Sequence, residues 1–149
     1  MSRAGAYASL PPDIAERWAK FGRGEADLYV NLLGFEVEDV RVDYCRMRMP
    51  FRNVLNQAAG IVHGGAIAGL LDSVVVPAVG SAYPPQARYA TVDMHVQFLA
   101  PLVADDAVAE GWVVKRGRST VFCQAEARAA KTDVVVARSM LTYNVSMPR

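Results

Sequence analysis

The sequence predicts an α+β fold in which a curved antiparallel sheet of five or six strands wraps around one long helix. Residues 64–81 would form a helix that is apolar on nearly all sides, so other structure must cover most of it. Apolar or alternating segments follow at residues 87–99, 107–115, 120–130 and 134–145. Turns of about three residues join the last three segments, which makes them antiparallel neighbours.

A short amphipathic helix is predicted near the N-terminus. Ile14, Trp18 and Phe21 follow the i, i+4, i+7 spacing of one helix face. Asp13 has the side chain and the position of an N-cap residue, and the glycines within residues 22–24 are suited to end the helix.

The segment between the two helices is expected to be mostly extended. Residues 31–34 should turn the chain, and residues 35–49 alternate between apolar and polar side chains with a break near Asp39. This pattern predicts two strands or one bulged strand. Residues 50–59 are expected to form a loop, and Pro77 should kink or end the long helix.

Composition limits the class of protein. The length of 149 residues predicts a single domain over residues 1–149, with residues 1–30 as an N-terminal helical extension. Sixteen basic and 15 acidic side chains leave a net charge of +1, which gives no general attraction to nucleic acid or anionic membranes. The 52% apolar content is high and suggests extra buried surface at a subunit interface.

The cysteine pattern and the apolar segments predict a cytoplasmic protein. Cys45 and Cys123 are too few and too far apart for a disulfide framework or a zinc motif, so we expect core positions in a reducing compartment. The N-terminal residues lack an apolar segment of signal-peptide length. The most apolar window, residues 64–80, is too short for a membrane span and holds Asp72 and Pro77. The two histidines lack ligand spacing, so no metal is expected.

Residues 60–72 contain the main candidate chemistry. A His63-Gly64-Gly65 turn opens the long helix, and its backbone N–H groups could polarise an oxygen at the helix N-terminus. Asp72 lies within the apolar helix, where a carboxylate is costly unless it is hydrogen-bonded or used. An acid or base and a group that stabilises negative charge on oxygen therefore occur in one short stretch.

Structural interpretations of the same residues remain open. Asp72 alone is compatible with a salt bridge at an interface, and Gly65 and Gly69 are compatible with close helix packing. Trp112, Phe98 and Phe122 are most simply core residues.

Helix geometry predicts a site that is shared between two subunits. Asp72 is eight residues after Gly64, about 12 Å along a helix axis. Its carboxylate therefore cannot reach an oxygen held by the amides of its own helix N-terminus. Two helices packed antiparallel across a two-fold axis would place Asp72 of one chain near the Gly64 and Gly65 amides of the other. We therefore expect a homodimer, or a dimer of dimers, with two such sites in each dimer.

The motif resembles that of a known family. The His63-Gly64-Gly65 turn and Asp72, together with the strand at residues 91–101 and the turn at residues 115–119, resemble hotdog-fold acyl-CoA thioesterases of the phenylacetic-acid-degradation (PaaI-like) group. The resemblance extends over roughly residues 31–143. It implies a hotdog fold, which is the helix-and-sheet arrangement expected above.

The resemblance also implies a reaction, the hydrolysis of an acyl-CoA thioester. The Gly64 N–H, with Gly65 beside it, would bind the thioester carbonyl oxygen. Asp72 of the other subunit would act as nucleophile or as general base on water. Thr91 would position the water or the carboxylate, and His63 would orient the loop. Coenzyme A is then part of the substrate, and no cofactor is implied.

Two further sets of residues follow from the resemblance. The family places Asn or Gln six residues before the histidine, and Gln57 has this position relative to His63, with Asn56 as the rival. Arg116 and Arg118 flank a turn that could bind the phosphates of coenzyme A.

Two other functions remain open. One is a non-catalytic hotdog protein that binds acyl-CoA or an aromatic ligand. The other is a hotdog hydratase or dehydratase, although His63 lies at the wrong end of the helix to work with Asp72.

Overall fold

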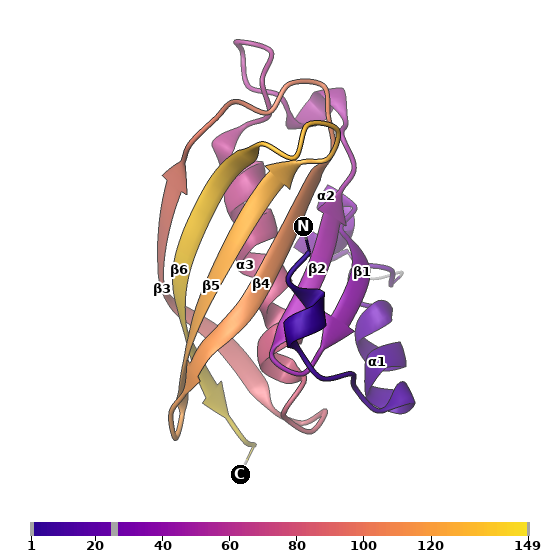
Figure 1. The fold of residues 1–149 in the computed structure, drawn as a ribbon, viewed down its shortest axis with the longest axis vertical. Helices are drawn as coiled ribbons and strands as arrows, with labels where there is room; N and C mark the ends of the chain where they lie inside the picture. The colour runs from indigo at the N-terminus through magenta and orange to yellow at the C-terminus, as the bar shows by residue number, and fades with distance from the viewer. Residues whose placement is uncertain (1, 25–26, 149) are drawn as a thin grey trace.

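The long helix α3 (Gly64–Gly80) lies against the inner face of a curved six-stranded antiparallel sheet (Figure 1). The structure is a computed structural model and describes residues 2–24 and 27–148. The strands are β1 (Glu36–Arg41), β2 (Tyr44–Met49), β3 (Arg88–Phe98), β4 (Ala107–Arg116), β5 (Thr120–Ala129) and β6 (Val135–Ser146). This arrangement confirms the predicted helix and sheet.

The strand order is β1-β2-β4-β5-β6-β3, and every neighbouring pair is antiparallel. The predicted adjacency of the last three segments is confirmed, since β4, β5 and β6 lie side by side. β3 comes earlier in the chain but pairs with β6, so β1 and β3 are the two edge strands. Residues 35–49 form two strands, and the first has a bulge between Val37 and Asp39.

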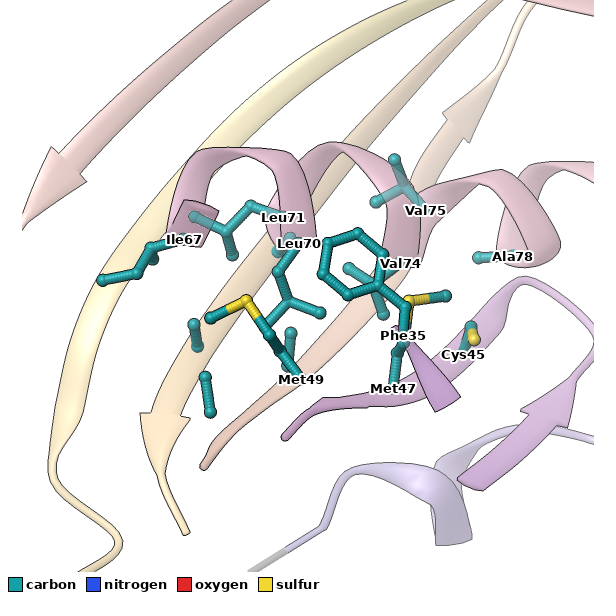
Figure 2. Packing of buried hydrophobic residues seen from close by; sticks show 14 of the residues in the cluster. Phe35, Cys45, Met47, Met49, Ile67, Leu70, Leu71, Val74, Val75 and Ala78 are labelled. Carbon is teal, nitrogen blue, oxygen red and sulfur yellow. The ribbon is translucent and has the colours of Figure 1, made fainter. Parts of the chain in front are cut away.

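The core lies between α3 and the sheet. Leu70, Val74 and Val75 are fully buried, and Figure 2 shows the helix beside Phe35 and the side chains of β2. Gly111 on β4 lets α3 approach closely, because a Cβ there would lie 2.8 Å from Val75 and 2.9 Å from Val74. Burial of α3 on most sides explains why its sequence has no polar face.

Two features of the helices differ from the prediction. Asp13 is not the N-cap: α1 (Pro12–Ala19) begins at Pro12, which is suited to the first helical position, and Asp13 lies in the first turn. Pro77 does not end α3, which continues to Gly80.

The turn predicted at residues 31–34 is instead the end of a short helix, α2 (Tyr29–Leu33). Gly34 ends this helix in the left-handed conformation at φ +70°, which explains why a glycine occurs there. Two short 3₁₀ segments, Ala4–Ala6 and Asn53–Leu55, complete the described helical structure, and the second falls within the predicted loop at residues 50–59.

α1 packs against the C-terminal end of α3. Trp18 is buried there, and a Cβ on Gly80 would lie 2.1 Å from its ring. The residues before α1 cross the outer face of the sheet, where the Arg3 guanidinium lies 4.2 Å from the centre of the Trp112 ring. No helix among residues 2–24 and 27–148 is long and apolar enough to cross a membrane.

The predicted core positions are partly wrong. Cys45 and Cys123 are buried as expected. Phe98 and Phe122 are exposed by 55% and 44%, and Trp112 is half-buried. Phe98 lies at the end of an edge strand, where its ring contacts the N-terminus of α3 but stays half exposed, and Phe122 is exposed on β5.

Candidate active site

At the N-terminus of α3, one backbone N–H group makes no hydrogen bond to a described residue. His63 is the N-cap, and its Nδ1 accepts a 2.8 Å hydrogen bond from the Gly65 N–H. The His63 carbonyl accepts a 3.0 Å bond from the Ala66 N–H. Within the described part of the chain, no hydrogen bond uses the Gly64 N–H. Because it lies at the positive end of the helix dipole, this amide is suited to bind a carbonyl oxygen or an anion.

His63 therefore has a structural role. Accepting from Gly65 uses the lone pair of Nδ1, so this ring nitrogen is the acceptor of the cap. A Cβ on Gly65 would lie 3.0 Å from this ring nitrogen. The capping bond therefore occupies the Gly65 amide and leaves Gly64 as the available donor.

A cavity of about 390 Å³ adjoins the Gly64 end of the helix. Its lining is mostly apolar and comes from the loop before α3, from α3, from the end of β3 and from the segment after it; it comprises Gln57, Ile61, Val62, Gly64, Ile67, Phe98, Leu99, Ala100, Pro101 and Leu102. The ring of Phe98 lies over Gly64, where a Cβ would be 3.1 Å from its Cζ. Absence of a side chain at Gly64 therefore lets the aromatic ring lie against the helix N-terminus.

Gln57 and Asn56 lie in different surroundings. Gln57 lines the cavity, and its Oε1 accepts a 2.9 Å bond from the Ala59 N–H, while its amide NH₂ makes no hydrogen bond to a described residue. Asn56 lies outside the cavity lining, pairs with Val62 in an isolated bridge, and has a buried Oδ1 that accepts no hydrogen bond from residues 2–24 or 27–148. Of the two, Gln57 is thus the residue that the fold brings to Gly64.

Asp72 is held by two hydroxyl groups. Thr91 on β3 donates to Asp72 Oδ1 at 2.9 Å, and Tyr143 on β6 donates to the same oxygen at 2.6 Å. The Tyr143 oxygen also lies 2.8 Å from the Asp72 carbonyl oxygen. Thr91 and Tyr143 are cross-strand partners, so both point toward α3. A bulge directly after Thr91 shifts the register, a feature common beside functional sites.

Tyr143 was missed by the sequence reasoning. Its signal was present, because Leu141, Tyr143 and Val145 alternate on the inward side of β6. A tyrosine at a buried position needs a partner for its hydroxyl group. Burial, together with the negative charge of Asp72, raises the pKa of Tyr143 well above its ordinary value. The hydroxyl therefore stays protonated and acts as a donor.

Arg116 lies at the other end of α3. It contacts Asp43 Oδ1, with the Nε–Oδ1 distance at 2.8 Å, and its Nη2 donates to the carbonyls of Ala78 at 3.2 Å and Val79 at 3.0 Å. Arg118 is exposed and makes no hydrogen bond to another described residue. In the described part of the chain, no cluster of three or more His, Cys, Asp or Glu side chains is suited to hold a metal ion.

The chain thus assembles two separate half-sites. One contains Gly64, Gln57 and Phe98, and the other contains Asp72 with Thr91 and Tyr143. Both half-sites involve the edge strand β3, near its two ends.

Comparisons with known proteins agree with this arrangement. A family model described as "Thioesterase superfamily" matches residues 59–143, which include Gly64, Asp72, Thr91 and Tyr143. A Halobacterium salinarum protein named "putative esterase" is 35% identical over 121 residues, which cover 73% of this chain and 80% of that protein.

Two solved structures are similar in fold. A thioesterase of Haemophilus influenzae has a TM-score of 0.80 and 19% identity, over 95% of this chain and 94% of its own. The PaaI protein of the Escherichia coli phenylacetic acid degradation operon has a TM-score of 0.75 and 19% identity, over 86% of this chain and 91% of its own.

One central helix wrapped by an antiparallel sheet, with a Gly-rich N-terminus and an acid eight residues along, defines a hotdog-fold protein. The chain belongs to the thioesterase superfamily.

Proposed function

We propose that the protein hydrolyses an acyl-CoA thioester to a free acid and coenzyme A. The observation that carries the proposal is the pairing of an uncommitted Gly64 N–H at a helix N-terminus with an oriented carboxylate, Asp72, in one thioesterase-family motif. The reaction needs no cofactor, because coenzyme A is part of the substrate.

The proposed chemistry uses both half-sites. The Gly64 N–H and the helix dipole stabilise the negative charge that develops on the carbonyl oxygen. As general base, Asp72 takes a proton from a water molecule while the oxygen of that water bonds to the carbonyl carbon. The C–S bond then breaks, and the proton passes from Asp72 to the departing thiolate. As nucleophile, Asp72 attacks the carbonyl carbon, the C–S bond breaks, and the coenzyme A thiolate leaves. Water then hydrolyses the resulting anhydride, which returns the Asp72 carboxylate and releases the free acid and a proton that neutralises the thiolate.

We further propose that the two half-sites come from different subunits. The edge strand β3 has one unpaired side along its 11 residues. Val92 and Phe98 on this strand are exposed by 66% and 55%, and Leu99 directly after it is exposed by 52%. An unpaired edge with exposed apolar side chains is a template for pairing with another strand.

Antiparallel pairing of two β3 strands would assemble the site. Thr91, the partner of Asp72, and Phe98, which covers Gly64, lie seven residues apart on β3. If the two-fold axis passes near Met94, Thr91 of one chain lies opposite the partner's Phe98. Asp72 then faces the Gly64 amide of the other subunit, and each dimer has two sites.

The first test is Asp72→Asn, which keeps the size of the side chain and removes its charge. We expect it to abolish thiol release from acyl-CoA substrates while the protein still folds and assembles like the wild type. Assays should use aromatic, branched and straight-chain acyl-CoA thioesters, with enoyl-CoA to detect hydration. Full activity of Asp72→Asn would contradict the mechanism. Binding without turnover in the wild type would favour a non-catalytic protein, and water addition to enoyl-CoA a hydratase.

The second test mixes two inactive variants. Gly64→Pro removes the proposed N–H donor at the first helical position, where proline is tolerated, and Gly64→Ala is its control because it adds a Cβ but keeps the donor. In a mixed dimer of Asp72→Asn and Gly64→Pro, one site carries both defects and the other carries neither. Activity should therefore return on mixing after dissociation and reassembly. If it does not return although mixed dimers form, each site belongs to a single chain.

A further inference from the structure

Tyr143 contacts the carboxylate that the proposed function places at the centre of the reaction. Its side chain is 2% exposed, and its hydroxyl oxygen lies 2.6 Å from Asp72 Oδ1 and 2.8 Å from the Asp72 carbonyl oxygen. A tyrosine has one hydroxyl proton, and the two oxygens positioned to accept it both belong to Asp72. The Thr91 hydroxyl group also contacts that of Tyr143. Among the described residues, Asp72 is therefore the acceptor for the Tyr143 proton.

The two carboxylate oxygens of Asp72 have different surroundings. Oδ1 accepts from Tyr143 and from Thr91, whereas Oδ2 accepts no hydrogen bond from residues 2–24 or 27–148. Asp72 is partly exposed, so Oδ2 is accessible. Two donors on one oxygen fix the plane and direction of the carboxylate, and the second oxygen remains available for water or a carbonyl carbon.

A second tyrosine–carboxylate pair in the chain, Tyr44 and Glu110, differs from Tyr143 and Asp72 in the partners of its carboxylate. Tyr44 donates to Glu110 Oε1 at 2.8 Å, and this carboxylate also contacts the Arg46 guanidinium and the Arg3 N–H. A cation and a backbone amide therefore saturate Glu110. Asp72 has no such ion pair among the described residues and is held by neutral hydroxyl groups alone.

We propose that Tyr143 is a positioning residue for thioester hydrolysis, which holds Asp72 Oδ1 so that Oδ2 faces the substrate. This inference rests on the proposed function. Tyr143 does not touch the substrate and acts only through Asp72. The other titratable group that faces Tyr143 is the Cys123 thiol on β5, which is buried as well.

The test compares Tyr143→Phe with Tyr89→Phe. The first removes only the hydroxyl group that binds Asp72. Tyr89 lies on β3 and is partly buried, and its hydroxyl group donates no hydrogen bond to a described residue. We expect Tyr143→Phe to lower kcat about 10- to 100-fold and to change KM less than about 2-fold, since a misplaced reacting group costs rate rather than binding. Tyr89→Phe should retain wild-type values.

The pH profile separates positioning from simple loss of stability. Hydrogen bonds to a carboxylate favour its charged form, so Tyr143→Phe should move the acid limb of kcat/KM to higher pH, and Thr91→Val should move it in the same direction. In the Asp72→Asn background, Tyr143→Phe should cause no further loss of residual rate, because the hydroxyl acts through the missing carboxylate. Urea unfolding of each variant shows whether the fold is retained.

The outcomes are distinct for the two proposals. A wild-type protein that hydrolyses none of the thioesters overturns the proposed function and this inference with it. An active wild type whose Tyr143→Phe variant is folded, with kcat within 2-fold and an unchanged acid limb, overturns the inference alone. Should Tyr143→Phe fail to fold, an unchanged kcat and acid limb in Thr91→Val would overturn it, since both hydroxyls hold the same oxygen.

Discussion

Arg116 and Asp43 connect the end of the central helix to the turn between β1 and β2. The guanidinium contacts Asp43 and also donates to the carbonyls of Ala78 and Val79, in the last turn of α3. These carbonyls are at the negative end of the helix, where a cation is favourable. Arg116 therefore stabilises the C-terminus of α3, a role distinct from the phosphate binding predicted for it.

Replacing Arg116 should mainly affect stability. We expect Arg116→Ala to lower the free energy of unfolding by about 2 kcal/mol, because it leaves Asp43 and two helix carbonyls without their donor. Arg118→Ala is the matched control and should change stability by less than about 0.5 kcal/mol. Urea unfolding followed by circular dichroism measures both values. Equal stability of the two variants would contradict this role for Arg116.

Arg118→Ala also tests phosphate recognition. Arg118 is exposed, and we expect Arg118→Ala to raise KM for acyl-CoA if the coenzyme phosphates bind at this turn. KM for an acyl thioester of a short pantetheine analogue, which lacks the nucleotide, serves as the reference. A KM that rises equally for both substrates would exclude recognition of the phosphates by Arg118.

Stability should fall in acid because of the carboxylates on the outer face of the sheet. Burial raises the pKa of Glu126, but hydrogen bonds from Arg138 and Arg128 outweigh it, so the pKa lies below its ordinary value of 4.5. A carboxyl group whose pKa is lower in the folded than in the unfolded protein stabilises the fold at pH values above its unfolded pKa. This stability is lost as the pH falls through its folded pKa. The urea midpoint of the wild type should therefore decrease below about pH 5.

Glu126→Gln should reduce stability near neutral pH and flatten this decrease, because the variant has no carboxylate to protonate there. Glu36→Gln, at an exposed position on β1, is the control and should keep the wild-type slope. A slope for Glu126→Gln as steep as that of the wild type would show that other groups cause the acid sensitivity.

Neither cysteine should react in the folded protein. Burial raises the pKa of Cys123 to about 12 and that of Cys45 well above its ordinary value, and the thiolate is the reactive form. A thiol reagent at about pH 8 should label neither residue in the native state and both in denaturant. Rapid native labelling would contradict the burial of the two thiols. The result also matters for the activity assay, because coenzyme A would then be the only thiol detected.

Much of the fold was predictable because it depends on local pattern. Residues 64–81 are apolar all round, so they had to form a buried helix, and the short turns between the last three segments required antiparallel neighbours. The position of β3 was not predictable in this way. Residues 99–106 carry the chain away from β3, and its pairing with β6 depends on long-range contacts. Phe98 was therefore predicted to be in the core, although it lies at an open edge.

The candidate site shows the same division. The Gly64 and Asp72 motif is contiguous in sequence, and Thr91 follows from the family resemblance. Tyr143 is 71 residues from Asp72, and their contact depends on the register of β6 against β3 and on the side of β6 that faces α3. Gln57 and Asn56 are adjacent in sequence, and only the folded loop distinguishes the one that lines the cavity.

The amino-acid sequence by itself determined the central helix, the spacing of its glycines and acid, and the alternation of the strands, because these depend on neighbours within one or two turns. Tertiary structure alone decided which hydroxyl groups hold Asp72 and which arginine caps α3. Those choices depend on strand order and register, which bring together side chains that are far apart along the chain.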